Sequence, residues 1–240
     1  MPQNPYMKRS SYLLPTIMIG AFVFAVSGAL ISARADSAAL STLAKPLPTP
    51  VRTQARTADA EFKRLLRLRD SLAKIPVEKI DRQPHKSFIK ANRKDIVYSE
   101  PAGQWLVRSD LFWNLRNKYK ALPIADDIAW AAAENPLPGE CEGDINCYIY
   151  TNRVTLAQYL SFYPNGKSAK KALAEIIEEL DYIVEDLNGK KGNYVGPDDK
   201  AGRDELAKRI AEMRVILSKV TAADRAKVIS QLATIGEAFR

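Results

Sequence analysis

Cys141 and Cys147 are the residues whose type and spacing point most directly to a chemical role, because they are the only cysteines in the 240-residue chain. Only five residues separate them. In an oxidising compartment an isolated pair this close is expected to form a disulfide within the chain. The pair lacks the C-x-x-C spacing of thiol oxidoreductases, which argues against redox catalysis. The surrounding segment 135–147 holds two prolines and two glycines, so we predict a stapled, irregular loop.

The same loop carries oxygen-bearing side chains at alternate positions, Glu140, Glu142, Asp144 and Asn146. Calcium is bound by such oxygen ligands. The spacing does not match the D-x-[DN]-x-[DN]-G pattern of the EF-hand loop. A calcium site formed by these four residues is therefore an alternative to a solvated acidic loop, and no other metal site is predicted.

No catalytic centre is predicted. The sequence contains no G-x-S-x-G, G-x-x-x-x-G-K-[ST], G-x-G-x-x-G or H-E-x-x-H motif, and its one histidine, His85, lies in an expected loop. Two carboxylates can cleave a glycosidic bond without histidine. Nothing selects such a pair among the 28 acidic residues, and the acids within 178–186 are expected to face water. A binding or scaffold protein without a cofactor is the leading interpretation, and a carboxylate-dependent envelope hydrolase is an alternative.

The net charge of +8 is concentrated in the first part of the chain. Residues 36–95 hold 14 basic and seven acidic residues, whereas 96–240 hold 19 and 21. Such a segment is expected to engage an anionic membrane or polymer surface, or another protein of the cell envelope. The alternative is a solvated basic linker, and nucleic acid is not an expected partner. The predicted surface-binding residues are Arg64, Arg67, Lys90, Arg93 and Lys94.

The N-terminus resembles an export signal. Residues 13–31 carry no charge and lead to Ala33-Arg34-Ala35, the small-x-small pattern of a signal-peptidase site. Cleavage is predicted before Asp36, with residues 1–35 as the signal peptide. The rival is an uncleaved anchor over 13–31, since about 20 apolar residues span a bilayer. Either interpretation places the rest of the chain outside the cytoplasm, in the periplasm or secreted.

A proline-rich linker is predicted over 36–56, followed over 57–95 by a basic amphipathic helix and a loop. Ala44–Thr53 contains three prolines, which favour an extended spacer. From Thr57 to Lys74 apolar residues recur at intervals of three and four. A helix of this kind either lies on a membrane or packs its leucine face on its own domain.

Residues 96–240 are predicted to form a mainly α domain of antiparallel helix hairpins with one small β-hairpin. Pro101-Ala102-Gly103 is expected to turn the β-hairpin, and Ser109 with Asp110 to cap a helix that ends at Leu122. Further helices are expected over 124–133, 148–163, 168–187 and 203–220. A final helix, with apolar residues from Val228 to Phe239, is expected to begin in a capping box of Thr221 and Asp224. The hairpins 148–187 and 203–239 are expected to share one core with the three tryptophans.

The segment Tyr159-Leu160-x-x-Tyr163-Pro164-Asn165-Gly166-x-x-Ala169-x-x-Ala172-Leu173 resembles a tetratricopeptide-like helix pair of bacterial envelope proteins. The resemblance covers one copy, residues 148–187, with no second copy at a 34-residue period. It implies a packed helix pair and protein partners, and it assigns no functional residue.

Overall fold

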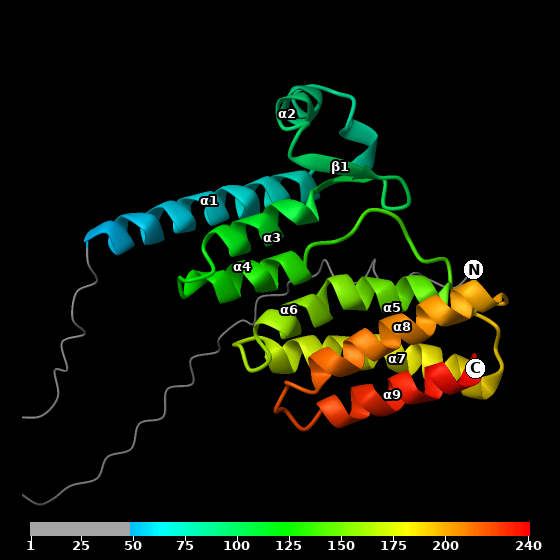
Figure 1. The fold of residues 1–240 in the computed structure, drawn as a ribbon. Coiled ribbons are helices and arrows are strands. Elements are labelled where there is room, and N and C mark those ends of the chain that lie inside the picture. Colours follow the sequence, from blue (N-terminus) through cyan, green and yellow to red (C-terminus); the bar gives the residue numbers. More distant parts are fainter. Residues whose placement is uncertain (1–48) are drawn as a thin grey trace, which may run out of the picture. The chain divides into compact units, whose positions relative to one another are not determined.

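The computed structural model describes residues 49–240, which are mainly α-helical with one two-stranded antiparallel sheet (Figure 1). The predicted signal or anchor over 1–35, including 13–31, and the linker up to residue 48 lie outside the described residues. Within 49–240, no helix is both long enough and apolar enough to cross a bilayer.

The first helix, α1 (Thr49–Ala73), begins within the expected linker, eight residues before Thr57. Pro50 lies in its first turn, where a missing backbone N–H breaks no helical hydrogen bond, so proline is compatible with a helix start here. The helix packs its leucine face on its own domain: Leu65, Leu68 and Leu72 are buried. Burying each such side chain stabilises the fold by roughly 2 kcal/mol.

A 3-10 turn, η2 (Val77–Lys79), and a short helix, α2 (His85–Ala91), connect α1 to the β-hairpin. Helix α2 was not predicted, and the expectation that His85 lies in a loop was wrong, because His85 is the first residue of this helix.

The predicted β-hairpin is confirmed as β1 (Ile96–Ser99) paired with β2 (Gln104–Val107). Its turn closes with a hydrogen bond of 3.0 Å from the Gly103 N–H to the Glu100 carbonyl. Gly103 has a φ of 60°, in the left-handed region that glycine enters without a steric penalty.

Helix α4 (Ile124–Ala133) has the expected bounds, whereas α3 (Ser109–Lys118) ends four residues before Leu122, the predicted last residue of that helix. The prediction that Ser109 and Asp110 cap α3 was wrong, because Arg108 occupies the N-cap position and Asp110 lies within the first turn, where a carboxylate still complements the helix dipole.

The single helix expected over 148–163 is two helices, α5 (Ile145–Val154) and α6 (Leu156–Phe162). The break is at Thr155, whose hydroxyl donates to the Thr151 carbonyl at 2.6 Å and whose ψ of −92° leaves the helical range. A threonine hydroxyl bonded back to the preceding turn competes with the backbone and bends a helix.

Three longer helices complete the chain: α7 (Ala169–Gly189), α8 (Lys200–Leu217) and α9 (Arg225–Ala238). Helix α9 packs mainly on α7, and α8 packs on α5, α6 and α9, so the two predicted hairpins interlock. The expected capping box at Thr221 was wrong: Asp224 makes no capping bond, and Thr221 instead donates its backbone N–H and its hydroxyl to Asn165 Oδ1 at 3.1 and 2.6 Å.

The apolar interior forms two clusters instead of the single shared core that was expected. The N-terminal cluster comes from α1 to α4 and includes Leu65, Leu68, Leu72, Phe112, Leu115, Ile128 and Ala132. The C-terminal cluster comes from α4 to α9 and includes Ala129, Ile149, Tyr159, Leu173, Ile176, Met213 and Leu232. Helix α4 belongs to both, and Trp113 contacts both.

The turn between α6 and α7 explains most of the motif that resembles a tetratricopeptide pair. The Tyr159 hydroxyl donates to Asp126 Oδ1 at 2.7 Å and accepts the Ser168 N–H at 3.0 Å. Burial, followed by the hydrogen bond to Asp126, raises the pKa of Tyr159. A Cβ at Gly166 would lie 2.5 Å from the Tyr159 hydroxyl, so only glycine fits there. The turn thus ties α4 to α6 and α7.

Candidate functional site

Basic side chains line the face of α1 that points away from the leucines. Arg52, Arg56, Lys63 and Arg67 of α1, and Lys74 directly after its last residue, are all exposed and follow one another at intervals of four and seven residues. These intervals keep them on one side of a helix with 3.6 residues per turn. At 1.5 Å per residue the five span about 33 Å. We refer to these five residues as the basic stripe.

Most of the basic stripe is free of ion pairs. Within residues 49–240, no ion pair engages Arg52, Arg56, Arg67 or Lys74. Lys63 pairs with Asp59 at 2.8 Å, and both side chains are about half exposed. Exposed pairs of this kind contribute little to stability. The basic stripe therefore presents an extended positive surface to the solvent.

The predicted surface-binding residues separate into two groups. Arg67 lies on the basic stripe, and Lys90 and Lys94 are exposed, without an ion pair to any described residue. Arg64 instead pairs with Asp95 at 2.8 Å, and the Arg93 guanidinium stacks on the Trp105 ring at 4.1 Å. Arg64 and Arg93 thus hold the β-hairpin region to its surroundings.

Arg52, Arg56, Lys63 and Lys74 were not among the predicted surface-binding residues. Arg52 and Arg56 join the periodic pattern only if the helix begins before residue 57, and the proline content of 44–53 placed that boundary too late. Lys63 and Lys74 lie within the predicted helix, where their spacing from Arg67 is the signal that places them on the same face.

The three tryptophans do not form a common platform. Trp105 contacts Tyr98 and Arg93, Trp113 lies 6.1 Å from the Phe162 ring, and Trp130 lies 5.3 Å from the Tyr159 ring. Each is only partly exposed and belongs to a different packing contact. Their arrangement is that of separate core aromatics.

The predicted disulfide between Cys141 and Cys147 is present, with a Cα–Cα distance of 5.3 Å. Its loop is fastened to the segment after α7 by two backbone hydrogen bonds, from the Ile145 N–H to the Val195 carbonyl at 3.0 Å and from the Val195 N–H to the Gly143 carbonyl at 2.9 Å. The disulfide therefore staples a loop that is also held from outside.

The four candidate calcium ligands do not converge. The Asp144 carboxylate caps α5 by accepting the Asn146 N–H at 2.9 Å, and the Asn146 amide donates to the Gly202 carbonyl at 3.1 Å. Glu140, Glu142 and Asp144 line an open hollow of about 470 Å³ beside the disulfide. Among residues 49–240, no group of three or more histidine, cysteine or acidic side chains is placed to hold a metal ion.

The acids within 178–186 were expected to face water, and Asp186 contradicts that prediction because it is only 4% exposed. Its carboxylate accepts the N–H groups of Asn193 and Tyr194, both at 3.1 Å, and the Asn193 side-chain amide at 2.7 Å. Burial opposes its ionisation, but the hydrogen bonds outweigh burial and lower its pKa. Asp186 thus fixes the segment 190–196 that holds the disulfide loop.

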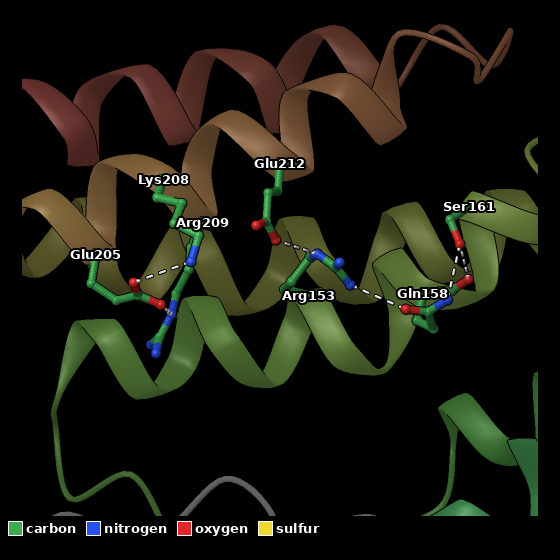
Figure 2. A network of polar contacts seen from close by, with 7 residues as sticks. All are labelled: Arg153, Gln158, Ser161, Glu205, Lys208, Arg209 and Glu212. Carbon is green, nitrogen blue, oxygen red and sulfur yellow. Dashed lines mark hydrogen bonds and ion pairs between the residues drawn. The ribbon is translucent and has the colours of Figure 1, made fainter.

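A polar seam joins α8 to α5 and α6 (Figure 2). Arg153 on α5 donates to Glu212 on α8 at 2.9 Å and to Gln158 at 3.1 Å. Arg209 on α8 donates to Glu205 at 2.9 Å and to the Asn146 carbonyl at 2.8 Å. Each guanidinium is therefore held by partners within the fold, and the seam serves to position α8.

Comparison of the chain with protein-family models, with curated proteins and with solved structures finds no match.

Proposed function

We propose that this chain is a non-catalytic binding or scaffold protein of the cell envelope, and that its basic stripe engages an anionic surface. The observation that carries the proposal is the alignment of five exposed cations over about 33 Å on the outer face of α1. The leucine face of the same helix is buried in the N-terminal cluster. Binding is therefore electrostatic, without insertion of this helix into lipid.

Location outside the cytoplasm is the second part of the proposal. The uncharged run 13–31 and the Ala33-Arg34-Ala35 pattern support export, and a structural disulfide is typical of oxidising compartments. Outside the cytoplasm, the anionic surfaces available to the cations of α1 are lipid headgroups and acidic envelope polymers. The resemblance of 148–187 to a tetratricopeptide-like pair adds a protein partner to the proposal.

The test measures partitioning of the full chain onto vesicles of phosphatidylglycerol and phosphatidylcholine, with vesicles of phosphatidylcholine alone as the reference. Each cation near an anionic membrane contributes about 1 kcal/mol. Arg56→Glu combined with Arg67→Glu should therefore cost at least about 2 kcal/mol, a roughly thirtyfold loss of partitioning. Raising the salt concentration should lower the partitioning of the wild type toward that of the variant, since the screening length falls to about 3 Å at 1 M.

The matched control is Lys170→Glu combined with Lys219→Glu, which removes the same charge from exposed positions on α7 and just after α8. Any partitioning caused by residues 13–31 is the same for both vesicle types and for all variants, so it does not affect the comparison between them. Equal loss in the control and in the α1 variant would show that only net charge matters and would overturn the role of the basic stripe. Turnover of an envelope glycan or peptide by the purified protein would overturn the non-catalytic proposal.

A further inference from the structure

A groove of about 340 Å³ runs between α8 and α9, which lie side by side at the C-terminal end of the chain (Figure 1). Its floor is apolar, made by Leu206 and Ile210 of α8 and by Leu232 and Phe239. Its walls are formed by small residues: Ala207 and Ala211 on one side, Ala233 and Gly236 on the other. Because the side chains on both walls are small, there is room for a third helix to pack closely against α8 and α9.

The apolar surface continues along the outside of α8. Ala207, Ala211 and Val215 are spaced by four residues, lie on one face and are all exposed, with 61% of Val215 accessible. An apolar row at helical spacing is typical of a face that receives a partner helix. Nothing within residues 49–240 covers this row.

The charges around the groove are positive. Arg203, Arg214 and Arg240 line it, and no ion pair to a described residue engages any of the three. Arg203 donates one hydrogen bond, to the Asp198 carbonyl at 2.7 Å. The acidic lining residue, Asp204, is paired with Lys200 at 2.6 Å. Arg203 and Arg214 are eleven residues apart on α8, which corresponds to about 16 Å. An apolar groove thus lies between two arginines separated by three helical turns.

We propose that this groove is a docking site for an amphipathic helix of a partner protein, with small and aliphatic side chains on one face and an acidic residue at each end of that face. Carboxylates about three turns apart would meet Arg203 and Arg214, while the apolar side chains would cover Ala207, Ala211 and the groove floor. Arginine forms bidentate hydrogen bonds with carboxylates, which fixes the register of the bound helix. A second copy of this chain would bring the same arginines against each other, and like charges disfavour that pairing.

The proposal goes beyond the binding of an anionic surface, because it involves no residue of α1. The probe is a fluorescent synthetic helix of about 18 residues, with two glutamates eleven positions apart and with leucine and alanine between them on the same face. A second probe replaces both glutamates by lysine. Binding is followed by anisotropy, and its location by backbone amide shifts of the full chain.

The glutamate probe should bind saturably, shift the amides of Ala207, Ala211 and Gly236, and bind about tenfold more tightly than the lysine probe. With Arg203→Glu combined with Arg214→Glu, the protein should bind the lysine probe more tightly than the glutamate probe. Lys170→Glu combined with Lys219→Glu is the charge-matched control and should leave the preference for the glutamate probe unchanged. Melting curves are recorded for both double variants, so that a folding defect is recognised.

Ala211→Gln, which places a polar side chain in the groove without changing charge, should weaken binding of the glutamate probe. No binding up to about 1 mM, equal binding of both probes, or amide shifts confined to α1 would each overturn the proposal. The Arg56→Glu, Arg67→Glu variant should bind the probe as the wild type does, so that failure of the groove and failure of the basic stripe are separate results.

Discussion

Charged side chains have different roles in the C-terminal half of the molecule and on the outer face of α1. In the C-terminal half, polar groups connect segments that are distant in the chain: Asp186 holds the segment 190–196, Arg153 bonds to Glu212, and Asn165 bonds to Thr221. In the N-terminal half, α1 is held by its leucine face and by the ion pairs Glu61–Lys118 and Arg64–Asp95, at 2.7 and 2.8 Å. On its outer face, Arg52, Arg56 and Arg67 form no ion pair to a described residue. Charges that have partners within the fold stabilise it, while free charges remain available for a binding partner.

The largest expected effect comes from placing a charge in the C-terminal cluster. Leu173→Asp puts a carboxylate at a fully buried position without a partner, which should cost several kcal/mol and unfold much of the protein at room temperature. Ile177→Asp, one turn later, should cost clearly less, because Ile177 is only partly buried at the edge of the cluster. Urea unfolding of both variants tests the prediction, and equal stabilities would contradict the assigned inner face of α7.

Removal of the disulfide is next in size. The chain-entropy relation gives about 2 kcal/mol for a loop this short. Cys141→Ala combined with Cys147→Ala should therefore lower the free energy of unfolding by about that amount, measured by urea denaturation. The bonds between this loop and Val195 should keep the variant folded. A reductant should destabilise the wild type and leave the stability of the variant unchanged. Alkylation of both cysteines in native, unreduced protein would contradict the disulfide.

Acid should weaken the clamp at Asp186. Its folded pKa lies below the ordinary value of 3.8, so the unfolded chain takes up its proton first as the pH falls. The stability it contributes is fully present above about pH 5 and is lost as the pH falls through the lowered pKa. Asp186→Asn should be less stable than the wild type at pH 7, and the difference should shrink toward pH 2. A constant difference across this range would show that ionisation of Asp186 does not matter.

The smallest expected effect on stability belongs to the basic stripe. Arg56→Glu combined with Arg67→Glu removes no ion pair to any described residue, so the free energy of unfolding should change by no more than about 0.5 kcal/mol. The same variant is expected to lose vesicle binding. A large loss of stability would mean that these cations stabilise the fold, as Arg153 and Arg209 do.

Elements that depend on neighbouring residues were predicted well from the sequence. Pro101 and Gly103 define the β-hairpin turn, and Pro123 precedes a helix whose bounds, Ile124–Ala133, match the prediction. The periodic apolar faces of α7 and α8 also identified most of their buried residues.

Features that depend on distant partners could not be predicted in the same way. Asp186 is buried because a loop returns over it, and Arg64 is paired because Asp95, 31 residues later, folds back to it. Arg52 and Arg56 of the basic stripe were not recognised because α1 begins earlier than the prolines suggest. The groove between α8 and α9 depends on how two helices pack, which the spacing within either one does not specify.

Helix α4 has a consequence for how this sequence can change over evolution. Its Ile128, Ala131 and Ala132 side chains enter the N-terminal cluster, while Ala129 and Ala133 enter the C-terminal one. A larger side chain at Ala129 or Ala132 would have to displace one cluster or the other, and close-packed interiors resist such insertions. Substitutions in α4 are therefore constrained from two sides at once. Sequence drift should be slowest there and faster on the outer face of α1, where lysine and arginine can replace each other because only the sign of the charge matters for the proposed binding.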